Sequence, residues 1–200
     1  GRVRNALTPD GAILDDAVVL YEQAFALLAL SAAHAAGIET ARCEAFVKRT
    51  GLINLPKEPL QITWTPRFLR AYGGAFLDSP GPLDKGEMSF FYVTPPPDDA
   101  TPAQVESMLR EDNDRMLALL AIHEAIPGHY LQLAAANETD RPLRAAFGSG
   151  VFAEGWAVYV TQVMLDRGYC ADDQALWLNH WKFYLRCVTN AIIDVRIHTM

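Results

Sequence analysis

Two histidines lie on either side of a Pro-Gly pair in an apolar, helix-like stretch. The proline and the glycine restrict how the chain can fold there. The stretch reads Ile122-His123-Glu124-Ala125-Ile126-Pro127-Gly128-His129-Tyr130. The two histidines, His123 and His129, are six positions apart. On an unbroken α-helix, side chains six positions apart point roughly 120° away from each other and lie about 9 Å apart along the axis. Pro127 offers no N–H to the carbonyl of His123, and its ring clashes there, so the helix must bulge or kink. Because Gly128 accepts unusual backbone angles, such a bulge would bring His129 back toward His123.

Imidazoles and carboxylates in such a stretch indicate a metal site. Burying them costs free energy unless a partner uses their charge and lone pairs, and a divalent metal can use several at once. A catalytic zinc ion takes three protein ligands and keeps a fourth position open. His123 and His129 are two candidates, and Glu154 is the best third, because it opens a helix-like run after the apolar residues 151–153. Two alternatives stay open, namely hydrogen-bonded core histidines and a Glu154 carboxylate stabilised by a helix dipole.

Composition limits the class of protein. Half of the 200 residues are hydrophobic, which is enough for one domain with a buried core. The formal net charge of -7 and the pI near 5.2 argue against a nucleic-acid partner, which needs a basic surface. No apolar run approaches the roughly 20 residues of a membrane span. The three cysteines form no CxxC pair, so we expect small buried side chains rather than disulfides or a thiolate metal site.

Apolar residues at helical spacing recur along most of the chain and predict a mostly α fold. The predicted helices cover residues 15–36, 39–48, 152–166 and 172–198. Gly37 would end the first of them. A further long helix would begin at Thr101, because Thr101 and Gln104 match a capping box. Its apolar face would continue to His123.

One short strand is predicted within this helical fold. Residues 88–94 are rich in aromatic and β-branched side chains, and three prolines at residues 95–97 end the run. Because proline is tolerated mainly at the edge of a sheet, we expect an edge strand or a lone ribbon. Residues 52–86 are rich in proline and glycine, which predicts an irregular connection with one short helix around residues 66–72.

Two motifs together resemble a known family. HEAIPGHYLQ at residues 123–132 is followed by FAEGWAVY at residues 152–159. In this order and spacing they resemble the bacterial domain-of-unknown-function family 885, over about residues 65–200. That family is similar in turn to the helical zinc peptidases, such as angiotensin-converting enzyme, the thimet-type oligopeptidases and the Taq-type carboxypeptidase.

The resemblance implies a helical zinc-peptidase-like catalytic core with one zinc ion per chain. His123, His129 and Glu154 would bind the metal. Glu124 would be the general base, taking a proton from the attacking water and passing it to the leaving amine. Family members usually carry an acidic residue further along the helix of Glu154, where this chain has Thr161. If that acid orients a ligand, metal binding is weaker in this chain.

Further site residues follow from the chemistry and the resemblance. A tetrahedral oxyanion needs donors besides the metal. His198 is the first candidate, because the resemblance reaches it, and Tyr159 and Arg196 are the others. The alternative for His198 and Arg196 is a salt-bridged helix face with Asp194.

The predicted strand has a role in the resemblance as well. Its residues Phe91, Tyr92 and Val93 would offer backbone groups to an extended peptide, as the equivalent strand does in similar peptidases. The alternative is simple packing of the aromatic side chains of Phe90 and Tyr92.

We therefore expect a zinc-dependent metallohydrolase that acts on short peptides or a small amide. The alternative is an inactive helical protein that binds a metal or a ligand. The chain begins at Gly1 without a signal-peptide pattern and stops at Met200 inside a helical pattern, so residues 1–200 are expected to be one domain of a longer protein, with part of the cleft outside them. Its compartment, cytoplasmic or periplasmic, and its oligomeric state stay open.

Overall fold

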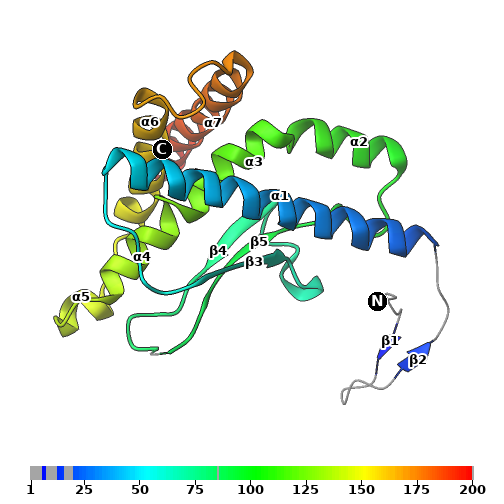
Figure 1. Ribbon diagram of the computed structural model, residues 1–200, viewed down its shortest axis with the longest axis horizontal. Helices are drawn as coiled ribbons and strands as arrows, with labels where there is room; N and C mark the ends of the chain where they lie inside the picture. The colour runs from blue at the N-terminus through cyan, green and yellow to red at the C-terminus, as the bar shows by residue number, and fades with distance from the viewer. Residues whose placement is uncertain (1–5, 8–12, 16–19, 85, 200) are drawn as a thin grey trace.

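The computed structural model describes residues 6–7, 13–15, 20–84 and 86–199, and most of these lie in helices (Figure 1). The predicted mostly α class is thus confirmed. The longest helix, α1 (Leu20–Thr50), runs across the molecule and contacts the sheet, the helix of residues 114–120 and the turn that carries His123 (Figure 1).

The predicted helix end at Gly37 is wrong, because α1 continues through it to Thr50. A glycine inside a helix costs only about 1 kcal/mol relative to alanine. Packing offsets that cost, since α1 contributes several fully buried side chains to the core: Ala36, Cys43, Phe46 and Val47. Of the first predicted helix, residues 16–19 lie outside the described residues.

The predicted edge strand is the centre of a three-stranded sheet. This strand, β5 (Ser89–Val93), pairs in parallel with β3 (Leu60–Trp64) and antiparallel with β4 (Ala75–Asp78). Both neighbours come from the Pro- and Gly-rich segment that was predicted to be irregular. Those strands are short, and the glycines and prolines around them hide the pattern. The predicted short helix in the same segment is confirmed as the 3-10 helix η1 (Arg67–Leu69). A separate ribbon joins β1 (Ala6–Leu7) and β2 (Ile13–Asp15).

The predicted capping box opens α2 (Pro102–Glu111), where the Thr101 hydroxyl accepts from the Gln104 N–H and the Gln104 side chain accepts from the Thr101 N–H. The helix does not continue unbroken to His123. It stops at the C-cap Asp112, and the Asn113 side chain caps a new helix, α3 (Asp114–Leu120). A side-chain amide oxygen that accepts from free N–H groups is a strong helix start, so a new helix begins here.

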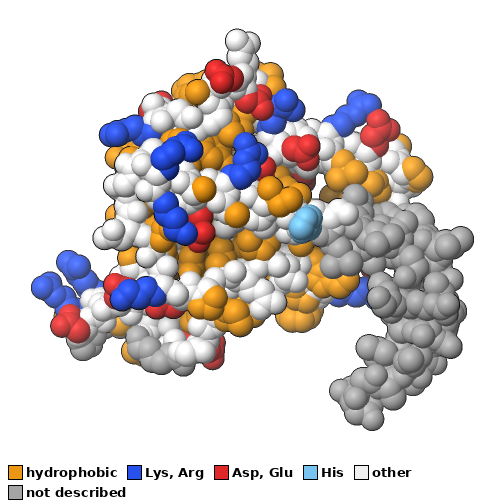
Figure 2. All heavy atoms as spheres, in the orientation of Figure 1, with side chains coloured by type: hydrophobic (Ala, Val, Ile, Leu, Met, Phe, Trp, Pro, Cys, Tyr) orange, Lys and Arg blue, Asp and Glu red, His pale blue; other side chains and the backbone are white. Residues whose placement is uncertain are grey.

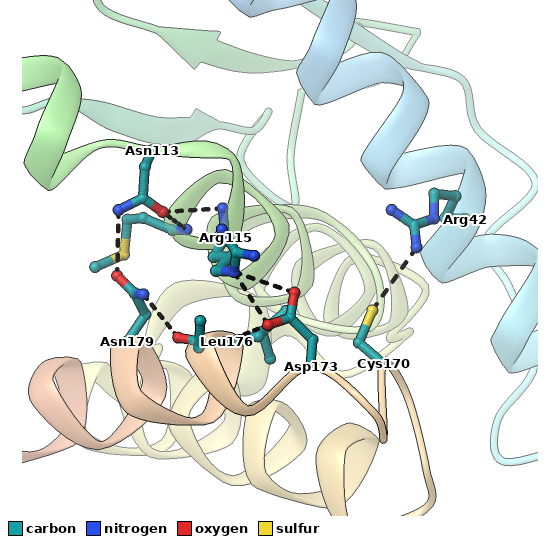
Figure 3. Close-up of polar contacts among 9 residues, drawn as sticks. Arg42, Asn113, Arg115, Cys170, Asp173, Leu176 and Asn179 are labelled. Carbon is teal, nitrogen blue, oxygen red and sulfur yellow. Dashed lines mark hydrogen bonds and ion pairs between the residues drawn. The ribbon is translucent and has the colours of Figure 1, made fainter.

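Two long helices complete the fold, α6 (Gly150–Asp166) and α7 (Gln174–Thr199), close to the predicted bounds. Polar contacts attach α7 to the preceding helices (Figure 3). Arg115 Nε lies 3.0 Å from Asp173 Oδ1, and Asn113 Nδ2 lies 3.5 Å from Asn179 Oδ1. Arg42 on α1 reaches Cys170 Sγ at 3.8 Å. These contacts hold α1, α3 and the start of α7 together.

The core lies between α1, the sheet, α3 and α6. Its largest fully buried apolar side chains are Phe91, Ile122, Met164, Leu165 and Leu176. Of the cysteines, which form no disulfide, Cys43 is fully buried and Cys170 and Cys187 are half-buried. On the face shown in Figure 2, basic and acidic side chains alternate with apolar ones. None of the helices in the described part of the chain has the length and apolar character needed to cross a membrane.

Candidate metal centre

The helix that carries His123 changes from α to π just before the motif. After α3, residues Ala121–Ala125 form one π-helical turn, η2, in which the Ile126 N–H donates to the carbonyl of Ala121 at 3.0 Å. Ile126 is extended, so the helix stops before Pro127, and α4 (His129–Asn137) begins afresh. Such π turns are frequent at functional sites. The predicted bulge is confirmed.

The interrupted helix brings the two imidazoles together. The ring centroids of His123 and His129 lie 5.0 Å apart, with the ring planes at 87° to each other. An unbroken helix would separate them by about 9 Å along its axis. On a straight helix, the spacing of these two histidines would prevent them from sharing a metal ion. In this interrupted helix, the same spacing is compatible with a shared metal ion.

Gly128 allows this arrangement in two ways. As predicted, its backbone angles are unusual, since its φ of -74° and ψ of -135° are neither helical nor extended. In addition, a Cβ at this position would lie 1.8 Å from the carbonyl oxygen of His123 and 2.4 Å from that of Ile122. Trp156 on α6 fastens the same loop, since its Nε1–H donates to the carbonyl of Pro127 at 2.9 Å. The loop packs directly on the π turn, and only glycine fits.

Glu154 joins the two histidines from α6. Its Oε2 lies 3.6 Å from His129 Nε2, and one donor atom from each of the three residues lies within 4.8 Å of the others. Donors to a tetrahedral zinc ion at about 2.0–2.1 Å lie roughly 3.3 Å apart, so small side-chain movements would close the site. His123 Nδ1 is buried and has no hydrogen-bond partner in the part of the chain that the structure describes. The two nitrogens and one oxygen fit a divalent metal, with room for a fourth ligand.

Burial keeps both histidines ready to bind a metal. It lowers the pKa of His123 to about 4, with a smaller contribution from His129. Burial also lowers the pKa of His129, against the opposing effect of the Glu154 carboxylate. Metal ligands must be deprotonated, and burial shifts both imidazoles toward the neutral form that binds a metal.

Glu124, next to His123 in the π turn, has the opposite shift. Burial raises the pKa of Glu124 to about 7, and the charge of Glu154 adds to this increase. The Leu77 N–H, which donates to Glu124 Oε2 at 3.2 Å, opposes the increase. A general base works best with a pKa near the operating pH. Leu77 belongs to β4, the strand that the sequence pattern did not reveal. The only indication of β4 in the sequence is the short apolar run that follows Gly73 and Gly74.

The raised pKa of Glu124 predicts a pH-dependent stability of the metal-free protein. Between pH 4.5, its ordinary pKa, and about 7, the folded state keeps a proton that the unfolded chain releases, so stability falls as pH rises. Glu124→Gln has no such proton. The free energy of unfolding of this variant, relative to wild type, should therefore increase by about 3 kcal/mol between pH 4.5 and pH 8. Urea unfolding in the presence of a chelator measures this difference. A difference that does not change with pH would contradict the prediction.

Of the predicted oxyanion donors, the structure places one at the site. Tyr159 lines an open cleft between α6 and α7, whereas Arg196 and His198 do not. His198 Nδ1 lies 3.4 Å from Asp194 Oδ1 on an exposed part of α7, as in the salt-bridge alternative. Thr161 is buried, and its hydroxyl donates to the carbonyl of Ala157 at 2.8 Å.

The predicted peptide-binding role of Phe91, Tyr92 and Val93 is wrong. Because β5 is central, its backbone groups pair with β3 on one side and β4 on the other. Phe91 and Val93 point into the core, and the rings of Phe90 and Tyr92 stack at 5.6 Å. Simple packing therefore describes these residues. The strand beside the site is β4, at the edge of the sheet.

The α6–α7 cleft has a volume of about 840 Å³. Two of the candidate metal ligands, His123 and Glu154, lie in its wall. The rest of the wall comes from α6 and α7: Gly155, Val158, Tyr159, Gln162, Trp181, Phe183, Tyr184, Cys187 and Asn190. The sequence did not reveal that the aromatic residues of α7 line a cleft, because large aromatic side chains on a helix usually pack in a core.

Two solved structures resemble this fold. One is described as a candidate lipoprotein of unknown function from Shewanella oneidensis, with a TM-score of 0.70 and 38% identity over 82% of this chain and 29% of that chain. The other is described as a candidate lipoprotein from Colwellia psychrerythraea, with a TM-score of 0.59 and 22% identity over 82% of this chain and 26% of that chain. The chain spans less than a third of the length of either.

The family comparison agrees with the motifs. A search of the curated proteins finds no match. A family model described as bacterial protein of unknown function matches residues 21–200, which is most of the chain. The chain therefore belongs to the DUF885 family of bacterial proteins of unknown function.

Proposed function

We propose that the protein is a zinc-dependent metallohydrolase that cleaves amide bonds in short peptides. The observation that carries this proposal is the meeting of His123, His129 and Glu154 beside an open cleft, with Glu124 adjacent. Both motifs resemble those of family 885, and the similarity of that family to the helical zinc peptidases supports the proposal. A structural ion pair would explain His129 and Glu154, but not the buried, unpartnered nitrogen of His123.

Each residue has a distinct part in such a reaction. His123, His129 and Glu154 would hold the ion, which supplies Lewis acidity when bound. Glu124 accepts a proton from a water molecule that attacks the amide carbon, and passes it to the nitrogen as the C–N bond breaks. The products are a carboxylic acid and an amine. The pKa of Glu124, raised to about 7, lets it take and release this proton near neutral pH.

Glu124 needs a fixed orientation for both transfers. The Leu77 N–H holds one carboxylate oxygen, Oε2, at 3.2 Å and leaves the other oxygen free to accept the proton. Tyr159, in the wall of the α6–α7 cleft, is the oxyanion donor that we retain from the sequence. Its hydroxyl could stabilise the negative charge that develops on the carbonyl oxygen.

Zinc content tests the metal centre directly. Purified protein dialysed against zinc at pH 7.5 should retain about one zinc ion per chain, measured by mass spectrometry of the metal. Loss of a residue that only hydrogen-bonds a metal ligand typically lowers metal affinity by roughly 10–100-fold. Glu154→Ala removes one of the three ligands themselves, so zinc affinity should fall by more than that. Glu138→Ala is a matched control, since Glu138 is exposed and follows α4, outside the site.

The outcomes separate the two functions. Wild-type protein that retains no zinc at neutral pH contradicts the proposal. Zinc binding with no hydrolysis of any peptide favours the alternative, an inactive metal-binding protein.

A further inference from the structure

We propose that the α6–α7 cleft binds a large apolar side chain of the substrate, preferably an aromatic one, close to the bond that is cleaved. This rests on the proposed function, since it takes the substrate to be a peptide. Three observations support it: an aromatic wall that reaches the candidate metal ligands, aromatic surface that is open to solvent, and the absence of a cation in that wall.

The aromatic wall begins at the metal centre itself. The Phe183 ring lies edge-to-face against His123, with centroids 5.4 Å apart. Tyr184 and Trp181 follow on α7, with their rings 6.0 Å apart and nearly perpendicular. Tyr159 faces them from α6 as part of the same cleft. A peptide whose scissile bond reaches His123 and Glu154 would therefore place a neighbouring side chain among these rings.

The rings are exposed enough to receive a ligand. Trp181 is 51% exposed, Tyr159 61% and Tyr184 39%. Covering apolar surface of this kind is favourable, and aromatic pairs gain further from edge-to-face contact. The cleft volume of about 840 Å³ lies within the roughly 300–1,000 Å³ of known ligand pockets. It can hold a large side chain together with the flanking peptide backbone.

Without a bound metal, the charge of the cleft disfavours acidic side chains. Among the described residues that line the cleft, none is lysine or arginine, and Glu154 is the one carboxylate. Gln162 is neutral, and its amide is already held by His180 Nε2 at 2.7 Å and by Asp166 Oδ1 at 2.8 Å. Without a bound metal, a substrate carboxylate would meet no cation among the described residues that line the cleft and would be repelled by Glu154.

Arg186 is close to the wall but does not provide that cation. Its guanidinium lies over the Phe183 ring at 5.6 Å, and Arg186 is not among the described residues that line the cleft. Its charge acts on Glu111 and Asp112, which belong to α2 and the turn after it, and also on Cys187 in the cleft wall. Without a bound metal, the expected order of side chains in the cleft is aromatic, then small, then acidic.

Peptide binding tests the inference without relying on hydrolysis. Three capped peptides, acetyl-Ala-X-Ala-amide with X as Phe, Ala or Glu, are titrated calorimetrically into Glu124→Gln, with and without zinc. The Phe peptide should bind at least about tenfold more tightly than the Ala peptide in both conditions, and without zinc the Glu peptide should bind more weakly than both. Trp181→Ala in the same background should remove most of the Phe preference, and Trp181→Phe should keep it.

Leu185→Ala is the matched control for Trp181→Ala. Leu185 lies on the same helix and is 66% exposed, but it does not line the cleft, so its loss should leave all three affinities unchanged. Equal affinity for the three peptides, no binding at all, or a Phe preference that survives Trp181→Ala would each overturn the inference. Zinc binding and hydrolysis without a Phe preference would overturn this inference alone. A Phe preference without zinc uptake would support the cleft and reject the metallohydrolase.

Discussion

Glu124→Gln is expected to abolish peptide hydrolysis while the protein still binds zinc. The glutamine side chain cannot take a proton from water, and loss of a general base typically lowers the rate by about 10²–10⁴-fold. Its carbonyl oxygen can still accept from the Leu77 N–H, as Oε2 of the carboxylate does at 3.2 Å. Since Glu124 is not one of the three residues whose donor atoms converge, zinc content should remain at about one ion per chain.

The assay needs two readings on the same preparation. Peptide fragments are measured by mass spectrometry, with the capped Phe peptide described above, and zinc is measured on the same sample. Glu138→Ala serves as the control that should retain both. Hydrolysis at the wild-type rate in Glu124→Gln would remove Glu124 from the mechanism. Loss of zinc in this variant would instead assign Glu124 to the metal site.

Gly128→Ala is expected to disrupt the metal centre and to destabilise the fold. The new Cβ would lie 1.8 Å from the carbonyl oxygen of His123, an atom of the backbone that cannot rotate away. The loop must therefore move off the π turn and take His129 with it. We expect the free energy of unfolding to fall by about 3 kcal/mol or more, because overpacking by one methyl group commonly costs 1–3 kcal/mol even where side chains can adjust.

Gly37→Ala is the natural control for this substitution. A Cβ at Gly37, inside α1, would meet no atom within 4 Å. Alanine there should stabilise the protein by up to about 1 kcal/mol, since it favours the helix. Urea unfolding and zinc titration measure both variants. Wild-type stability and zinc affinity in Gly128→Ala would show that the loop does not depend on its close contact with His123.

The elements that follow from local rules could be predicted from the sequence. The capping box at Thr101, the helices of residues 152–166 and 172–198 and the interruption at Pro127 depend on residues only a few positions apart. The approach of His129 to His123 follows from that interruption. These features were predictable because the hydrogen bonds and the steric clash that set them lie within the same segment.

Features that depend on distant partners could not be predicted in this way. Local preference predicts a helix end at Gly37, but α1 continues because residues on both sides of it, Ala36 and Cys43, are buried in the core against the sheet and α3. The strands β3 and β4 are too short to recognise alone and exist through their pairing with β5. For that reason the backbone of β5 is not free for a substrate.

The sequence by itself determined the donor types of the candidate metal centre and the break in the helix between its two histidines. Only the tertiary structure decided that Glu154 comes within 3.6 Å of His129, that Leu77 orients Glu124 and that α7 completes the cleft. The physical reason is the sequence separation over which each interaction acts. Proline and capping act within one turn of helix, whereas burial and pairing join segments that the sequence keeps far apart.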